Sequence, residues 1–82
     1  MKLEYIDGCT HSSMSIDGEE LRDMDLSRIR NILTEIIGKE TDLYTLQSVF
    51  RTLLECAGVE ECSSVPCEHC GDYTIKYTLE IN

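Results

Sequence analysis

The sequence has 82 residues, with 16 acidic and 7 basic side chains and a net charge of −9 at pH 7. A chain of this length forms one domain at most, so residues 1–82 are expected to be a single domain without room for a large active-site cleft. The excess of acid argues against direct binding to nucleic acid, because phosphates attract a basic surface. Hydrophobic residues make up 41% of the chain, enough for a small core that a metal ion or a partner often supplements.

The sequence also bears on the compartment. The N-terminus has no features of a secretory signal, and no apolar run is long enough to span a bilayer. Five cysteines are an odd number, which fits poorly with a closed set of disulfides. We therefore expect a cytoplasmic protein with reduced thiols and no membrane contact. In that setting a cysteine pattern indicates metal binding or catalysis more often than disulfides.

The N-terminal part of the chain is predicted to form β structure. Residues 1–7 alternate weakly between apolar and polar side chains, which is typical of a short strand. An Asp-Gly pair at 17–18 then separates two short runs, 13–16 and 19–22. Such a pair favours a two-residue hairpin turn, because that turn needs positive φ at both positions.

Two amphipathic helices are predicted to follow. Asp25 is the expected N-cap of the first and Gly38 its stop, whereas Thr41 or Asp42 caps the second and Gly58 ends it. Apolar residues recur at helical spacing, namely Leu26, Ile29, Ile32, Leu33, Ile36 and Ile37 in the first helix and Leu43, Leu46, Val49, Phe50, Leu53, Leu54 and Ala57 in the second. Because the link is short, we expect antiparallel helices whose apolar stripes form the core. An exposed partner groove on one helix is the alternative.

The C-terminal part is predicted to be a cysteine-bearing loop over 59–72 and a strand over 73–81. Strict alternation in the latter range indicates a half-buried strand with one wet face. Together the elements predict an α+β fold. Its small antiparallel sheet combines the N-terminal strand, the Asp-Gly hairpin and the C-terminal strand, with an antiparallel two-helix hairpin packed on one face.

The stretch Cys67-Glu68-His69-Cys70-Gly71 is the local pattern that carries chemistry. Two cysteines separated by two residues let both sulfurs converge on one ion, and the following glycine lets the backbone curl around it. These five residues resemble one knuckle of a zinc ribbon. A closed zinc site needs two further ligands.

Pairing of the first and last strands supplies two candidates. If these strands are antiparallel, Cys9 and His11, which follow the first, lie beside Cys67 and Cys70, which precede the last. We therefore predict a structural Zn²⁺ site with the ligands Cys9, His11, Cys67 and Cys70. This zinc would join the two ends of the chain.

Other ligand sets and other roles for the thiols remain open. Cys62 or His69 are alternatives to His11, whereas Cys56, among apolar neighbours on the second helix, is expected to be a small buried side chain. Free thiols without metal and a redox pair formed by the CxxC are the alternatives to zinc. The redox pair is disfavoured because a reactive CxxC usually lies at a helix N-terminus, where the dipole lowers the thiol pKa.

Acidic residues concentrate near the predicted site. Residues 1–25 contain seven acids and two bases, and residues 55–72 contain five acids and no base. If the chain ends meet, one end of the molecule is strongly negative. That end is either a solubilising surface or a docking surface for a basic protein.

These features predict a binding protein. No catalytic motif such as GxSxG or HExxH is present, so we do not expect an enzyme. The composition is similar to that of small acidic phage and mobile-element proteins that inhibit DNA- or RNA-handling enzymes. We expect a regulator or inhibitor of a basic, nucleic-acid-processing protein that does not itself bind nucleic acid. The alternatives are a structural zinc module that oligomerises or joins a larger assembly, and a CxxC thiol redox protein.

Overall fold

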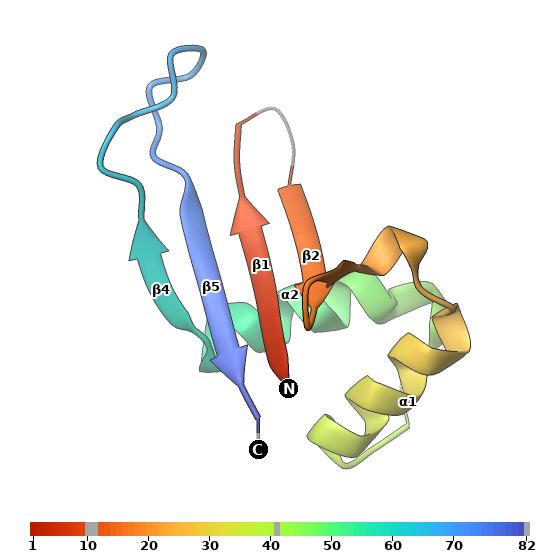
Figure 1. The fold of residues 1–82 in the computed structure, drawn as a ribbon. Coiled ribbons are helices and arrows are strands. Elements are labelled where there is room, and N and C mark those ends of the chain that lie inside the picture. The colour runs from red at the N-terminus through yellow and green to blue at the C-terminus, as the bar shows by residue number, and fades with distance from the viewer. Residues whose placement is uncertain (10–11, 41, 82) are drawn as a thin grey trace.

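The computed structural model describes residues 1–9, 12–40 and 42–81. The elements follow in the order β1 (Lys2–Asp7), β2 (Ser12–Ile16), β3 (Glu19–Glu20), the 3₁₀ turn η1 (Leu21–Asp23), α1 (Leu26–Ile37), the 3₁₀ turn η2 (Leu43–Thr45), α2 (Leu46–Ala57), β4 (Val59–Cys62) and β5 (Ile75–Glu80). The five strands form one antiparallel sheet in the order β3-β2-β1-β5-β4 (Figure 1). The predicted α+β class is confirmed.

The first and last strands of the chain lie side by side at the centre of the sheet. The β1–β5 ladder is antiparallel, as the predicted metal site requires, and runs from Lys2 opposite Glu80 to Asp7 opposite Ile75. Consequently the chain leaves β1 and enters β5 at the same end of the two strands (Figure 1). This end carries the cysteines described below.

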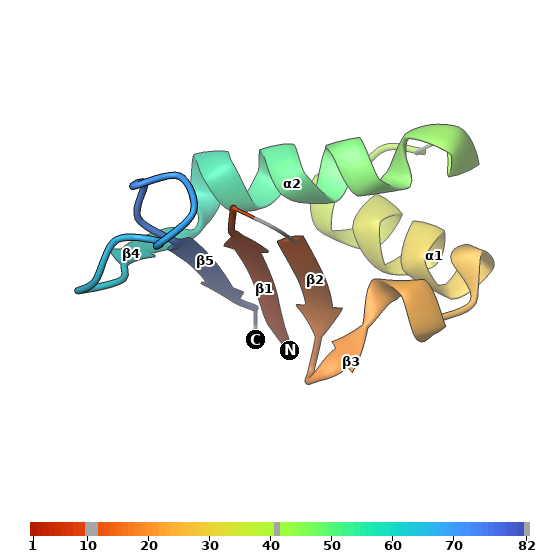
Figure 2. The ribbon, with the colours of Figure 1, turned by 90° about the horizontal axis from the view of Figure 1, so that it is seen from above.

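One face of the sheet is covered by helix and the other carries charged side chains. Figure 2 shows α2 passing over the strands, with α1 to the side of β2. Leu3 and Tyr5 point to the covered face and are buried. On the opposite face, the Glu4 carboxylate forms an ion pair with Lys76 Nζ at 3.0 Å. The apolar side chains of β1 therefore pack toward the helices, and those of β5 are half-buried against the same core.

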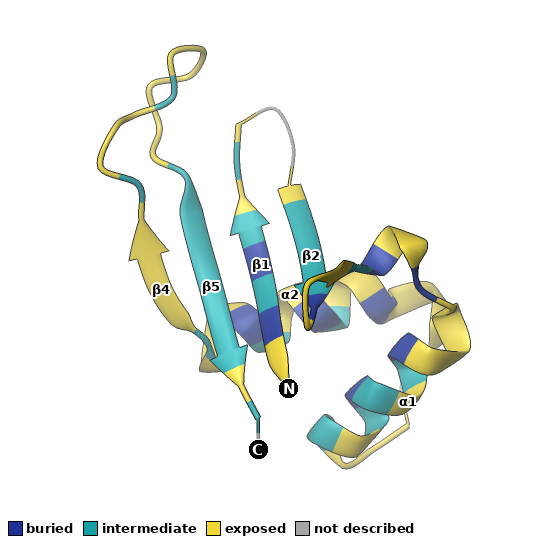
Figure 3. Cartoon of the chain, in the orientation of Figure 1, coloured by how far each residue is buried: buried dark blue, intermediate teal, exposed yellow. Residues whose placement is uncertain are grey.

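The core lies between the sheet and the helices. Its buried residues come from β1, β2, η1 and the inner sides of both helices (Figure 3). They are Leu3, Tyr5, Ile16, Leu21, Met24, Ile29, Leu33, Leu46, Phe50 and Leu54. The predicted apolar stripes supply half of this set. Leu26, Leu43 and Ala57 are exceptions. Leu26 and Leu43 lie at the starts of their helical segments and are 57% and 40% exposed, and Ala57, the last residue of α2, is exposed as well.

The helix boundaries follow local signals. The Asp25 carboxylate accepts a backbone N–H of the first turn of α1, and Gly38 ends that helix with φ 82°. Asp42 also accepts a backbone N–H, but the turn that it caps is η2, which precedes α2. The other predicted cap, Thr41, lies outside the described residues. No helix in the described ranges has both the length and the apolar character needed to cross a membrane.

Three predictions about the strands need correction. The hairpin strand predicted over 19–22 ends at Glu20, because the chain turns into η1 and buries Leu21 in the core. The loop predicted over 59–72 begins with β4, whose residues are all exposed and therefore give no alternating pattern. The last strand begins at Ile75 rather than at residue 73.

Candidate metal centre

The loop that carries the CxxC motif is closed at its base by continuation of the β4–β5 ladder. The Ser63 N–H donates to the Thr74 carbonyl at 2.8 Å, and the Thr74 N–H donates back to Ser63 Oγ at 3.1 Å. These bonds tie both ends of the loop to the sheet. The motif is thereby held close to the edge at which β1 ends.

Within the loop, residues 67–72 form a tight turn. The Gly71 N–H donates to the Cys67 carbonyl at 2.9 Å, and the Cys67 N–H donates to the Asp72 carbonyl at 2.8 Å. Gly71 has φ 77°, a left-handed conformation that disfavours side chains with a Cβ. The His69 N–H donates to Cys67 Sγ at 3.4 Å. The backbone of the turn thus directs a hydrogen-bond donor at the sulfur of its first cysteine.

Three cysteines converge at this edge of the sheet. Cys9 follows β1, and its Sγ lies with those of Cys67 and Cys70 in a group whose members are all within 4.8 Å of one another. Tetrahedral zinc with Zn–S bonds of about 2.3 Å separates its sulfur ligands by roughly 3.8 Å. A contraction of about an ångström or less would therefore bring the three sulfurs to a shared metal ion.

Of the four predicted ligands, the structure brings together Cys9, Cys67 and Cys70, and His11 lies outside the described residues. Among the described residues, the alternatives Cys62 and His69 contribute no ligand atom to the group. Both are exposed. The convergence therefore involves the CxxC motif and the segment after β1, as strand pairing predicts.

Cys56 differs from expectation. It is exposed on α2, whereas its apolar neighbours in sequence predict burial. The buried residues of α2 include Phe50 and Leu54. At 100° per residue, Cys56 points about 200° away from Leu54 and hence to solvent. Apolar neighbours in sequence are thus a poor guide to the direction of a helical side chain.

The thiols of the cluster have shifted pKa values. Backbone N–H groups of Cys70 and His69 face Cys67 and lower its pKa, because they stabilise the thiolate. The Cys9 thiol interacts with the sulfurs of Cys70 and Cys67, which raises the pKa of Cys9 to about 12. A bound cation would displace the remaining protons, because thiolates are the ligands. Three thiolates suit soft or borderline metal ions.

Exposed carboxylates lie on the elements that adjoin this cluster. We use the term acidic end for Asp7 at the end of β1, Glu60 and Glu61 on β4, and Glu68 and Asp72 in the loop, all of which are exposed. Among the described residues, no basic side chain forms an ion pair with any of the five. Their charges are therefore not neutralised by ion pairs within the part of the chain that the structure describes.

Function has to be inferred from the residues of this chain itself. No protein-family model, curated protein or solved structure matches it.

Proposed function

We propose that this chain is a non-catalytic zinc-binding protein that presents its acidic end to a basic protein surface. The observation that carries the proposal is the convergence of Cys9, from the segment after β1, with Cys67 and Cys70 from the loop before β5. The N–H donated by His69 to Cys67 Sγ adds support, since it favours the ionised sulfur that zinc binds. We assign His11 as the fourth ligand because it follows Cys9 by two positions.

The role of zinc in this proposal is structural. Four protein ligands leave no open coordination position for a substrate or an activated water. Binding would be coupled to folding, with apparent free energies of roughly 10–16 kcal/mol in small zinc peptides. Such a contribution is large compared with what the core of a domain this small supplies. The metal would hold the loop between β4 and β5 against the end of β1.

Cysteine-to-serine variants test the metal site directly. Cys9→Ser, Cys67→Ser and Cys70→Ser should each lose most bound zinc and unfold at a lower temperature. Cys56→Ser and Cys62→Ser are matched controls, because these exposed thiols lie outside the cluster. His11→Ala should weaken zinc binding if His11 is the fourth ligand. Full zinc content in the Cys9, Cys67 and Cys70 variants would contradict the site.

The acidic end supports the second part of the proposal. Five exposed carboxylates without an ion-pair partner among the described residues create a negative field. Three thiolates and one Zn²⁺ would add a further negative charge. Such a surface attracts a basic one and competes with nucleic acid for it. We therefore propose regulation or inhibition of a protein that handles nucleic acid through a basic groove.

Binding to a lysine-rich peptide tests the acidic end. The affinity should fall steeply with added salt, because exposed charges are screened. The double variant Glu60→Gln/Glu61→Gln should bind more weakly than Glu35→Gln/Glu40→Gln, which removes the same charge from α1 and the segment after it. Equal affinities of these two variants would contradict a localised docking surface.

A thiol redox function is the second candidate. The N–H groups that lower the pKa of Cys67 also increase the fraction of reactive thiolate at neutral pH. This CxxC precedes a strand and lacks the helix N-terminus that usually activates such pairs. We therefore favour zinc, and alkylation with and without metal separates the two candidates.

A further inference from the structure

We propose that the outer edge of β2 binds an extended basic segment of a partner protein, which adds to the sheet as a further strand. This site is separate from the metal centre and from the acidic end. It would give the molecule a second contact, made by main-chain hydrogen bonds, beyond the function proposed above.

The inference begins with an incomplete edge. β3 pairs with two residues of β2, Ser15 and Ile16, and the chain then leaves the sheet as η1. Among the described residues, no strand pairs with Ser12–Met14 on that side. An edge of this kind is a template for pairing with another chain.

Backbone alternation determines which groups point outward. The Asp17 N–H donates to the Lys2 carbonyl on β1 at 2.8 Å, so the peptide groups of Ile16 face the opposite way, toward Glu19 in β3. In an antiparallel ladder, successive residues of a strand point their backbone N–H and C=O groups alternately to one side of the strand and to the other. Met14 and Ser12 therefore turn their N–H and C=O groups to the same outer side as Ile16, where an added strand would meet them.

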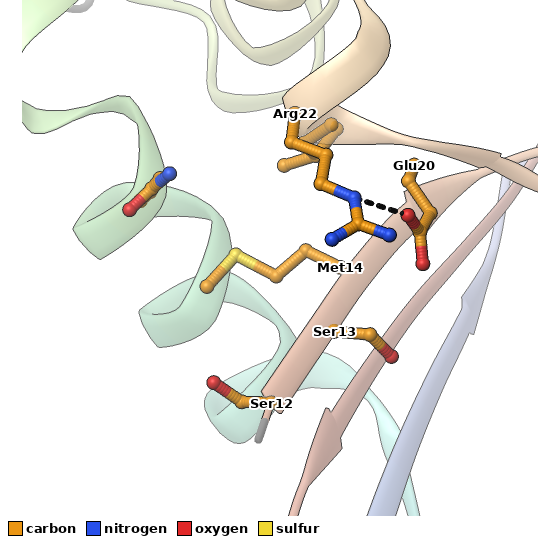
Figure 4. Close-up of a pocket in the computed structure, with 7 residues that line it drawn as sticks. Ser12, Ser13, Met14, Glu20 and Arg22 are labelled. Carbon is orange, nitrogen blue, oxygen red and sulfur yellow. Dashed lines mark ion pairs between the residues drawn. The ribbon is translucent and has the colours of Figure 1, made fainter.

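The space beside this edge is large enough to hold a ligand. A cavity of about 510 Å³ lies there, lined by Ser12, Ser13, Met14, Glu20, Leu21, Arg22 and Gln47. Figure 4 shows Ser12 and Met14 pointing from β2 toward α2, while Ser13 points away. The volume falls within the range of about 300–1,000 Å³ that is typical of ligand pockets. An added strand could place alternate side chains against Met14 and Leu21.

One basic side chain at the rim can move aside. Arg22 Nε pairs with Glu20 at 2.6 Å, but the Arg22 side chain is 78% exposed (Figure 4). An ion pair this exposed contributes little to stability. Release of Arg22 would free the Glu20 carboxylate for a basic residue of the incoming segment.

The groove is lined by one acid, Glu20, and one base, Arg22, but the segment that carries them is acidic and favours a basic occupant. Residues 17–25 contain five acids and the single base Arg22. Glu20 pairs with Arg22, and Glu19 pairs with Arg28 at 2.8 Å. Asp17, Asp23 and Asp25 have no ion-pair partner among the described residues. Lysines or arginines along an added strand would complement this excess of negative charge.

Amide NMR with an octapeptide that alternates lysine with valine tests the proposal. Binding should shift the backbone amides of Ser12, Met14 and Arg22. Two N-methylated peptides, one methylated at its odd-numbered residues and the other at its even-numbered residues, distinguish strand addition from attraction by charge alone. The peptide whose methyl groups replace the N–H donors that face β2 should lose about tenfold or more in affinity. The other peptide should retain its affinity.

Protein variants complete the experiment. Ser12→Pro removes an outward N–H at the first position of a strand, where proline is tolerated, and should weaken the peptide. If Ser12→Pro fails to fold, Met14→Lys takes its place. It puts a positive charge in the groove and should also weaken peptide binding. In the Glu60→Gln/Glu61→Gln protein, the affinity measured from the amide shifts of β2 should be unchanged. This result separates the β2 site from the acidic end. Absence of binding, equal affinity of the two N-methylated peptides, or amide shifts confined to β4 would each overturn the proposal.

Discussion

The ring of Tyr5 on β1 stacks on that of Tyr77 on β5, with centroids 5.7 Å apart and planes inclined by 11°. The two residues are also direct partners in the β1–β5 ladder. Such a cross-strand aromatic pair favours one register over its neighbours. The same register brings Cys9 next to Cys67 and Cys70. The stack and the cysteine cluster are therefore linked through a single strand pairing.

Loss of this stack should weaken both the fold and the metal site. We expect Tyr77→Ala to lower the free energy of unfolding by about 1–3 kcal/mol, because aromatic contact and half-buried area are lost together. Zinc should also dissociate faster from this variant. Tyr44→Ala is the control, since Tyr44 is 97% exposed, and its effect should stay within about 0.5 kcal/mol. Denaturant titration and zinc release to a chelator measure the two effects, and equal values for both variants would contradict the link.

Tyr5 should make stability fall at alkaline pH. Burial, and after it the Asp7 charge, raise the pKa of Tyr5 above its usual 10.0, although the Arg51 charge opposes the shift. The unfolded chain then loses this proton more readily than the folded chain. The stability that Tyr5 contributes is complete below about pH 10 and is lost as the pH rises through the folded-state pKa. Tyr5→Phe should show a flatter decline in unfolding free energy above that pH, and parallel profiles would refute this.

Alkylation should separate the thiols outside the cluster from the metal ligands, of which Cys9 and Cys70 are also exposed. With zinc bound, iodoacetamide should modify Cys56 and Cys62 and leave the other three cysteines unmodified. After removal of the metal, all five should react. Mass spectrometry of the intact chain counts the adducts. Rapid modification of Cys67 in the presence of zinc would instead favour the redox function.

Gly58 should not tolerate a side chain. A Cβ at this position would lie 2.5 Å from the Leu54 carbonyl oxygen, where backbone atoms must shift to admit it. We expect Gly58→Ala to cost about 1–3 kcal/mol, the usual range for overpacking. Ala57→Ser, at the exposed neighbouring position, is the control and should be nearly neutral. Equal thermal midpoints of the two variants would show that the turn between α2 and β4 adapts.

The features predictable from the sequence are those with a strong local signal. Asp25 and Gly38 mark the ends of α1 through capping chemistry, and the alternation of residues 75–80 marks a strand whose half-buried Tyr77 and Leu79 pack against the core. Pairing of the first and last strands was the assumption on which the predicted metal site rested, and the structure has this pairing. That pairing was sufficient to predict that Cys9 would approach Cys67 and Cys70.

The features that could not be predicted depend on tertiary contacts. β4 has both faces exposed, so only its pairing with β5 makes it a strand. η1 replaces the end of a hairpin because burial of Leu21 outweighs continued strand pairing. The direction of Cys56 depends on how α2 is rotated against the sheet. None of these is encoded in a short stretch of sequence.

Native mass spectrometry of the purified chain in reducing buffer, with and without a zinc chelator, tests the metal-joined fold most directly. We predict one zinc ion per chain and a narrow distribution of low charge states without chelator. Chelation should remove the ion and shift the chain to the high charge states of an unfolded protein. A chain that carries no zinc, yet keeps compact charge states and cooperative unfolding in both buffers, would contradict the account.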